Sequence, residues 1–310
     1  MTWTAAVIRA RTLATPDIVV LDLAPADDGA FPTYTAGAHI DVRLDSGLVR
    51  QYSLCGPPGS GFYRLAVLNV ADSRGGSRAM HALAVGDQVR ISVPRNHFPL
   101  VTARRHVLIA GGIGITPLLA MLLELERSGA DYILHYSARS RRRAAFLAEL
   151  SANPRVRFHF DDADPALLLD VARDLGDPLP ETAVYVCGPD GFLDYVTGKA
   201  VALGWPRQAL HTERFGAGPP VAGAGFTVRL SSTGAEYPVP GDRSVLDVLL
   251  EHGVDAPFSC GQGICGECVV RVLAGEPDHR DDVLTEGERA DGQFTTCSSR
   301  AHSPTLELDL

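Results

Sequence analysis

The sequence Cys260-Gly-Gln-Gly-Ile-Cys265-Gly-Glu-Cys268, with Cys297 further along the chain, decides the fold of the C-terminal part of this protein. Its cysteines follow the pattern Cys-x4-Cys-x2-Cys with a distant fourth cysteine, which is the plant-type spacing for a [2Fe–2S] cluster. Three glycines stand between them, and glycine lets backbone N–H groups approach ligand sulfurs. We therefore predict that Cys260, Cys265, Cys268 and Cys297 ligate the two irons of such a cluster.

Two other uses of these cysteines stay open at this point. A zinc site usually carries two Cys-x2-Cys pairs, whereas here only Cys265 and Cys268 have that spacing. Disulfide bonds would require a secreted chain, and 6 cysteines among 310 residues are too few for a disulfide scaffold. The spacing favours the iron–sulfur cluster, with zinc second and disulfides third.

The composition is that of a soluble globular protein. Hydrophobic residues make up 45% of the chain and charged residues 21%, and the length suffices for two or three domains. The first ten residues lack a basic region followed by an apolar run, so we expect no signal peptide. The uncharged stretch 107–123 contains Gly111-Gly112-Ile-Gly114 and Thr116-Pro117, which favour a strand, a loop and a helix over a membrane span. We expect a cytoplasmic protein with no membrane association.

The net charge of −9 is unevenly distributed. Residues 225–310 contain 15 Asp and Glu but only 6 Arg and no Lys, whereas the rest of the chain has 22 charges of each sign. A concentrated negative charge argues against binding to nucleic acid or to anionic membranes. It suits a basic protein partner, and it suits solubility alone equally well.

Residues 1–102 are predicted to form a small antiparallel β-barrel. Ala38–Leu44 and Leu48–Leu54 alternate in polarity on either side of Asp45-Ser-Gly47, which is a hairpin pattern. Further strands are expected at Phe62–Val70 and Gln88–Val93, and a short helix at Ala79–Leu83. The loop before that helix is rich in Gly, Ser and Arg, and its free N–H groups suit a phosphate.

Residues 103–215 change to alternating strands and helices, which predicts a parallel sheet with helices on both faces. The expected strands are His106–Ala110, Tyr132–Ser137, Val156–Phe160, Ala183–Cys187 and Ala209–Glu213. The first helix is expected to start at Thr116 as its cap and to end at Gly129. Such sheets bind ligands at the carboxyl ends of their strands, where Gly111–Pro117 and Cys187-Gly188-Pro189 lie.

Residues 216–224 are rich in Gly, Pro and Ala and are predicted to be a linker. Residues 225–310 then form the third domain. Its expected elements are strands at Phe226–Leu230, Glu236–Val239, Val269–Leu273 and Thr305–Leu308, a helix at Ser244–His252, and a capping box at Thr285–Glu288. This order, with the cysteine loop in the middle, predicts a β-grasp (α+β) ferredoxin domain.

Three motifs resemble those of a known family. Arg50-Gln-Tyr52-Ser53-Leu54 resembles the flavin motif of the ferredoxin–NADP reductase superfamily. Gly111–Pro117 and Cys187-Gly-Pro189 resemble its nicotinamide motifs, and the cysteine pattern resembles plant-type ferredoxins. The order flavin, nicotinamide, then C-terminal [2Fe–2S] is that of the phthalate dioxygenase reductase family, and the resemblance covers essentially the whole chain.

The resemblance implies a role for each residue of these motifs. Arg50 would bind the flavin phosphate, Tyr52 would pack along the flavin, and Ser53 would form a hydrogen bond near flavin N5. The second phosphate-binding loop would consist of Arg74, Gly75, Gly76 and Ser77. The flavin would be FMN, because the family with this domain order uses FMN. Tyr52 is alternatively an ordinary barrel residue.

The nicotinamide site is implied in the same way. Its lining would consist of Gly112, Gly114, Thr116, Ser137, Arg139, Cys187, Gly188 and Pro189. Cys187 would lie near nicotinamide C4, and Phe215 would shield the flavin ring; alternatively, Phe215 is a core aromatic residue. With Ser53, these two residues form the predicted catalytic set. The family favours NADH, but the loop after Ser137 contains several arginines and no acid, so NADPH stays open.

The resemblance implies an electron-transfer reductase. A nicotinamide donates two electrons as hydride, a [2Fe–2S] cluster accepts one, and a flavin placed between them does both. An all-cysteine cluster has a low potential, on the order of −400 mV, which suits an electron donor. The expected acceptor is a separate terminal oxygenase of Rieske type, and the expected reductase is a monomer.

Three alternatives are kept. The chain could reduce small acceptors directly, or it could donate electrons to a cytochrome P450. It could also be a non-catalytic interaction protein with zinc at the cysteines, although the flavin and nicotinamide motifs argue against that.

Overall fold

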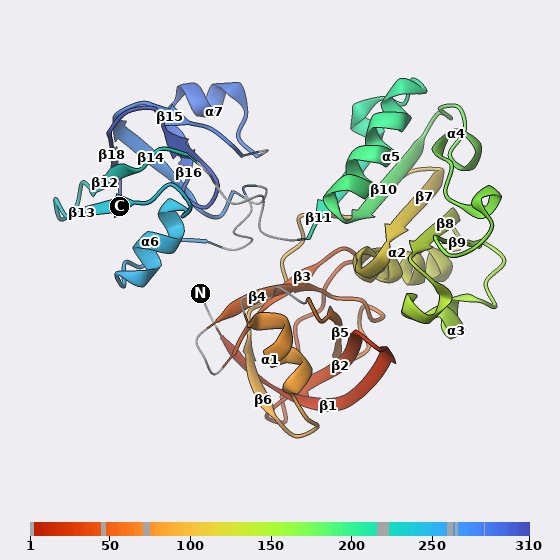
Figure 1. Cartoon of the computed structure of the whole chain (residues 1–310). Coiled ribbons are helices and arrows are strands. Elements are labelled where there is room, and N and C mark those ends of the chain that lie inside the picture. Colours follow the sequence, from red (N-terminus) through yellow and green to blue (C-terminus); the bar gives the residue numbers. More distant parts are fainter. Residues whose placement is uncertain are drawn as a thin grey trace. The chain divides into compact units, whose positions relative to one another are not determined.

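The structure is a computed structural model that describes residues 3–44, 48–70, 75–215, 223–258, 263, 266–281 and 283–310. The chain divides into two compact units, Met1–Phe215 and Gly216–Leu310 (Figure 1). Of the predicted linker, only Gly223 and Ala224 belong to the described residues. Among the helices in these ranges, none is long and apolar enough to cross a membrane.

An antiparallel sheet of six strands forms the first part of the unit Met1–Phe215 (Figure 1). Its elements are β1 (Thr4–Thr15), β2 (Ile18–Pro25), β3 (His39–Arg43), β4 (Val49–Ser53), β5 (Tyr63–Leu68), α1 (Gly76–Ala82) and β6 (Gln88–Ile91). The strand order is β4-β3-β6-β1-β2-β5. The two edges approach each other, because the N–H of Cys55, just after β4, donates to the carbonyl of Arg64 on β5 at 2.9 Å. This arrangement is the predicted barrel.

The hairpin predicted at residues 38–54 is present. β3 pairs antiparallel with β4, which places Ile40 opposite Tyr52 and His39 opposite Ser53. Its turn, residues 45–47, lies outside the described residues. The long β1–β2 hairpin is missing from the predicted strands, although Pro16 and Asp17 form its turn between a partly alternating run and a mostly apolar run.

A five-stranded parallel sheet forms the second part of the same unit, as predicted. Its elements are β7 (Arg105–Gly111), α2 (Ile115–Ser128), β8 (Asp131–Ala138), α3 (Leu147–Leu150), β9 (Val156–Phe160), α4 (Val171–Asp174), β10 (Thr182–Gly188), α5 (Asp190–Ala202) and β11 (Leu210–Arg214). The strand order is β11-β10-β7-β8-β9. α2 and α5 pack into different hydrophobic clusters on opposite faces of this sheet (Figure 1).

The first helix of this sheet starts differently from the prediction. α2 begins at Ile115, and its N-cap is Gly114, which provides no side-chain cap. The expectation that Thr116 caps the helix is therefore wrong: its hydroxyl lies inside the first turn and donates to the carbonyl of Ile113 at 3.1 Å. A short 3-10 turn over residues 112–114 carries the chain directly from β7 into α2 and removes the need for a capping side chain. The helix ends before Gly129, whose φ of 69° is left-handed, as expected.

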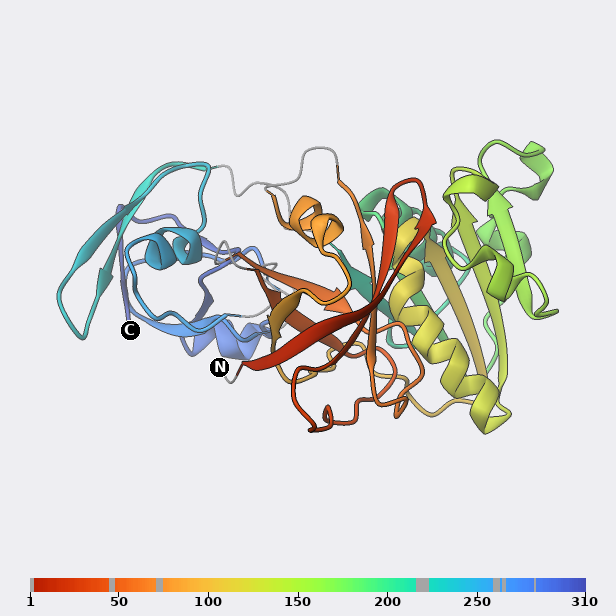
Figure 2. The same cartoon turned by 90° about the horizontal axis from the view of Figure 1, so that it is seen from below.

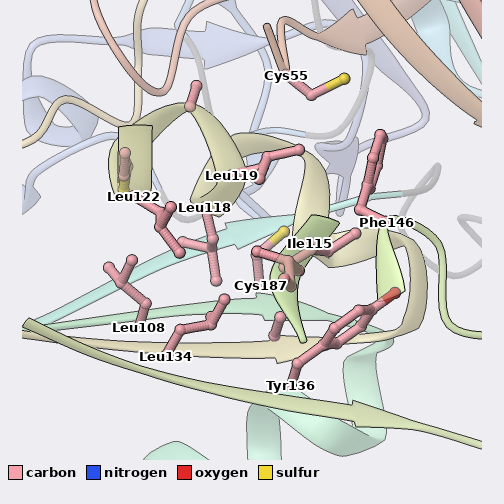
Figure 3. Packing of buried hydrophobic residues seen from close by; sticks show 14 of the residues in the cluster. Cys55, Leu108, Ile115, Leu118, Leu119, Leu122, Leu134, Tyr136, Phe146 and Cys187 are labelled. Atoms are coloured by element: carbon pink, nitrogen blue, oxygen red, sulfur yellow. The ribbon is translucent and has the colours of Figure 1, made fainter. Parts of the chain in front are cut away.

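One hydrophobic cluster joins the barrel to the parallel sheet. It contains Phe98 and Cys55 from the barrel segment, Leu119 and Leu122 from α2, and Leu134 from β8. Figure 3 shows α2 between Cys55 on one side and Leu108 and Leu134 of the sheet on the other. Figure 2 shows the same helix along the sheet, next to the barrel strands. This shared core fixes the position of β4 relative to the carboxyl ends of the parallel strands.

The unit Gly216–Leu310 is the predicted β-grasp. Its elements are β12 (Phe226–Leu230), β13 (Glu236–Val239), α6 (Val245–Glu251), β14 (Val269–Ala274), β15 (Pro277–Asp278), α7 (Glu286–Ala290), β16 (Gln293–Thr295), β17 (Arg300–Ala301) and β18 (Thr305–Leu308). Its main sheet has the order β13-β12-β18-β14-β16, with β12 and β18 parallel. Ser244 caps α6 by accepting from the N–H of Asp247 at 3.0 Å, and Thr285 and Glu288 form the predicted capping box at α7.

Candidate cofactor sites

The predicted flavin-phosphate residues come together at the start of α1. The side chain of Arg50 lies against Gly76, since a Cβ at Gly76 would come within 2.6 Å of Arg50 Nε. Gly75 turns the chain into the helix with a left-handed φ of 98°. A guanidinium at the start of a helix is suitable for binding a phosphate, so these residues fit the flavin phosphate. Arg74 lies outside the described residues.

The neighbouring residues also have defined positions. Ser77 Oγ accepts from the N–H of Val70 at 3.2 Å. Tyr52 is half-buried against the barrel core. Burial raises the pKa of Tyr52 to about 12, with Arg50 acting in the opposite direction, so the ring stays neutral.

Ser53, Cys187 and a residue that the sequence did not indicate, Glu213, meet where the barrel faces the parallel sheet. Ser53 is 6% exposed, and its Oγ donates to Glu213 Oε2 at 3.3 Å. Glu213 on β11 is the direct neighbour of Cys187 on β10 in the strand register. Two of the three predicted catalytic residues therefore lie around one carboxylate at the carboxyl ends of two strands.

The protonation states of Glu213 and Cys187 follow from their burial. Burial raises the pKa of Glu213 to about 8, and the hydrogen bond from Ser53 only partly opposes this. Burial, and then the Glu213 carboxylate, raise the pKa of Cys187 well above its usual range, so Cys187 is a thiol and not a thiolate. At neutral pH the site therefore holds an uncharged thiol next to a carboxyl group that can keep or release a proton.

The sequence could have indicated Glu213 as a site residue only if the strand order had been known. It ends the last predicted strand of the parallel sheet, and polar residues at that end of a strand face the ligand site. The sequence did not show that β11 pairs with β10, nor that Ser53 of the barrel would reach it.

Glycines bring the two nicotinamide loops into contact. A Cβ at Gly114 would lie 2.2 Å from the carbonyl oxygen of Cys187, so only glycine allows the two backbones to approach this closely. Gly111 and Gly188 both leave room for the ring of Phe192 on α5. Gly112 has a left-handed φ of 57° and faces open space. The two loops predicted to bind the nicotinamide are thus one continuous surface.

The remaining predicted nucleotide residues differ in availability. Thr116 is buried, and its hydroxyl is engaged by Ile113. Ser137 Oγ is buried and has no hydrogen-bond partner among the described residues, which fits a ligand hydroxyl in that position. Arg139 is exposed, and Phe215 is half-buried against the shared hydrophobic cluster.

A pocket of about 540 Å³ opens beside the carboxyl ends of β8 and β9. Its lining includes Arg141, Arg142 and Asp162, with Arg141 stacked over the ring of Phe160 at 5.5 Å. The third arginine of the loop, Arg143, is used elsewhere, in an ion pair with Asp17 of the barrel at 2.9 Å. The pocket therefore presents both positively and negatively charged side chains to a nucleotide.

Two of the four predicted cluster ligands are described. Cys268 and Cys297 are buried, and their sulfurs lie 3.1 Å apart, much longer than a disulfide bond of about 2.05 Å. The N–H of Gly263 points at Cys297 Sγ from 3.1 Å. Two adjacent thiols and a backbone donor fit a metal–thiolate site. Cys260 and Cys265 lie outside the described residues.

Comparison with known proteins identifies the family. The sequence profile of the 2Fe-2S iron-sulfur cluster binding domain matches residues 228–302. The vanillate O-demethylase oxidoreductase of Pseudomonas putida is 48% identical over 98% of this chain and 99% of its own length. The solved structure of phthalate dioxygenase reductase, titled as a modular structure for electron transfer from pyridine nucleotides to [2Fe-2S], superimposes with a TM-score of 0.81 at 36% identity, covering 99% of this chain and 98% of that one.

The chain belongs to the phthalate dioxygenase reductase family. A further similar structure is that of an intact type IV self-sufficient cytochrome P450 monooxygenase, with a TM-score of 0.81 and 40% identity. It matches 99% of this chain, which spans 41% of that protein.

Family membership confirms the fold class, the enzyme class and the cofactors. As a member of this family, the protein is a flavin and iron–sulfur oxidoreductase with FMN, a reduced nicotinamide and a [2Fe–2S] cluster as its cofactors. It is the electron-transfer component of an oxygenase system. The cluster, and not zinc, is therefore the metal centre of the unit Gly216–Leu310.

Proposed function

We propose that this reductase passes electrons from NADH to a separate terminal oxygenase of Rieske type. The observation that carries the proposal is the contact of Ser53 with Glu213 beside Cys187. It brings the flavin motif of the barrel to the nicotinamide motif of the parallel sheet, as direct hydride transfer requires. The bound cofactors supply the redox chemistry, in which two electrons arrive as hydride and leave singly.

The residues of the chain bind, orient and manage a proton. Arg50 and the loop Gly75–Ser77, with Arg74, hold the flavin phosphate, and Tyr52 and Phe215 cover the ring. Gly112, Gly114, Thr116, Gly188 and Pro189 shape the nicotinamide site, with Cys187 as an uncharged wall. The Glu213 carboxyl group keeps a proton within hydrogen-bond reach of Ser53 Oγ. Cys260, Cys265, Cys268 and Cys297 ligate the cluster.

The preference for NADH is argued from the pocket at β8 and β9. Asp162 lines it together with Arg141 and Arg142. The arginines could accept a 2′-phosphate, whereas the carboxylate hydrogen-bonds to ribose hydroxyls and repels a 2′-phosphate, and we assign the ribose contact to Asp162. Ser137 and Arg139 would contact the adenosine half. If the proposal holds, Asp162→Asn raises kcat/KM with NADPH relative to NADH. A wild-type enzyme that already prefers NADPH would contradict it.

The electron exit is proposed to be the acidic C-terminal domain. Residues 225–310 carry the whole net charge of the chain, −9, so a basic surface on the oxygenase would be attracted to them. We take the domains as 1–102, 103–215 and 225–310, with 216–224 as linker, in a monomeric cytoplasmic protein. Electron delivery to the oxygenase should slow as ionic strength rises, while reduction of a neutral dye should not.

A second candidate acceptor is a cytochrome P450. It is favoured by the similarity to the reductase part of the self-sufficient P450 monooxygenase, in which a comparable chain is fused to its acceptor. Purified reductase mixed with a Rieske-type oxygenase and, separately, with a P450 distinguishes the two. NADH-driven turnover of the oxygenase, at a rate limited by the oxygenase and not by the reductase, supports our proposal. If the reductase drives turnover of the P450 but not of the oxygenase, the proposal is overturned.

A further inference from the structure

A second polar cluster lies in the parallel sheet, in a different unit from the cysteines. His135 on β8 and His159 on β9 are only 3% and 6% exposed, and their rings stack with centroids 5.3 Å apart. His135 Nδ1 lies 3.0 Å from His159 Nε2. Asp174, at the end of α4, completes the group: one possible ligand atom from each of the three residues lies within 4.8 Å of the other two.

Two of the three members, His159 and Asp174, are oriented by hydrogen bonds to residues outside the group. His159 Nδ1 lies 2.9 Å from the carbonyl of Leu167, which can only accept, so the proton is on Nδ1 and the lone pair on Nε2 points toward His135. The carboxylate of Asp174 accepts from the Arg173 guanidinium at 2.8 and 2.7 Å and from the N–H of Asp170 at 2.9 Å. Metal-binding imidazoles and carboxylates are held in this way by their surroundings.

The protonation states also suit a cation. The hydrogen bond between the two rings is donated by His135 Nδ1, because the proton of His159 is on its Nδ1. His135 Nε2 is buried and has no hydrogen-bond partner among the described residues. His135 Nε2 can therefore take up the proton that Nδ1 shares with His159, which leaves the lone pair of Nδ1 for a cation.

We propose that His135, His159 and Asp174 bind one divalent transition-metal ion, with Zn²⁺ as the expected ion. Two imidazoles and one carboxylate are ligands of zinc and its neighbours, whereas calcium and magnesium prefer all-oxygen sites. No net proton has to be lost, because His135 can move its single proton from one ring nitrogen to the other. Three protein ligands leave a further position for water.

The position of the site gives it a consequence for the nucleotide pocket. His159 is the direct neighbour of Ser137 in the β8–β9 register, and His135 lies two residues before Ser137 on the same face of β8. Arg173 also donates to the carbonyls of Ala166 and Leu168, so the ion would tie the segment after β9 to the sheet. The metal therefore stabilises the edge of the sheet that carries the adenosine half of the nicotinamide nucleotide.

The test uses the full-length holoprotein, stripped with a chelator and then titrated with Zn²⁺ against a chromogenic competitor. We expect about one zinc per chain, bound at least tenfold more weakly by His135→Gln, His159→Gln and Asp174→Asn. His252→Gln, an exposed histidine in the other unit, is the matched control and should bind zinc like the wild type. Unchanged visible absorption of the cluster shows that zinc has not displaced iron.

Two results overturn the proposal. One is a wild-type protein that binds less than one zinc per chain in competition with the chromogenic chelator. This result does not depend on whether any variant folds. The other is equal zinc affinity in the wild type and in Asp174→Asn with its flavin and cluster retained. Asp174 lies at a helix end, so this variant is the least demanding for folding.

Discussion

Replacing Glu213 by glutamine should remove a pH dependence from the reduction of the flavin by NADH. The pKa of Glu213 is raised to about 8, since burial disfavours the charged carboxylate more than the hydrogen bond from Ser53 favours it. Below that pKa, the Glu213 carboxyl group carries a proton next to Ser53. Above it, the protonated fraction falls with pH, and between pH 7 and pH 9 it decreases about tenfold. If the reaction uses this proton, the rate constant of the wild type should decrease by the same factor.

The assay is anaerobic stopped-flow reduction at saturating NADH, followed by bleaching of the flavin absorption. Glu213→Gln keeps a side chain that can hydrogen-bond to Ser53 but cannot ionise, so its rate should be constant from pH 6 to pH 9. Glu236→Gln, which changes an exposed carboxylate in the other unit, is the control and should retain the wild-type profile. Identical profiles in the wild type and Glu213→Gln would refute the role of Glu213 as the proton-holding group.

Three further substitutions test other parts of the site. Gly114→Ala forces a Cβ to within 2.2 Å of the carbonyl oxygen of Cys187, so we expect a cost of about 1–3 kcal/mol, seen as a KM for NADH raised about fivefold or more with flavin content unchanged. Arg50→Ala removes a charged phosphate partner and should weaken FMN binding by about 1.5–3 kcal/mol, measured by fluorescence during dialysis; unaltered FMN affinity would exclude this phosphate site. Cys297→Ser should keep NADH-to-dye activity at the flavin but lose electron delivery to a cytochrome or an oxygenase, and undiminished delivery would disprove the proposed electron order.

The sequence predicted the fold because its local patterns agree with the tertiary structure. The strands β9, β12, β13 and β18 begin and end at the predicted residues, and the other strands of the parallel sheet differ by one residue at either end. These segments alternate in polarity or are uniformly apolar, and Gly, Pro or Asp bounds them. The β1–β2 hairpin was missed even though it has the same pattern, and Thr116 was misassigned as a cap because the 3-10 turn before α2 is invisible in the sequence.

The sites were predictable to the extent that they lie on contiguous motifs. The cysteine spacing and the segment Arg50–Leu54 are local motifs, so the sequence alone indicates them as sites. Glu213 and the His135–His159–Asp174 group are not local: they form only when β11 pairs with β10 and β9 with β8. The packing of Gly114 against Cys187 likewise explains a glycine that in the sequence looked like an ordinary turn residue.

The most direct test of the proposed electron path is an anaerobic titration of the purified protein with NADH, followed by visible absorption. If FMN and one [2Fe–2S] cluster lie on one path, the absorption of both should bleach, and the titration should saturate at three electrons per chain, two on the flavin and one on the cluster. Bleaching of the flavin alone, with the cluster still oxidised at saturation, would contradict the proposed path from nicotinamide to iron–sulfur cluster.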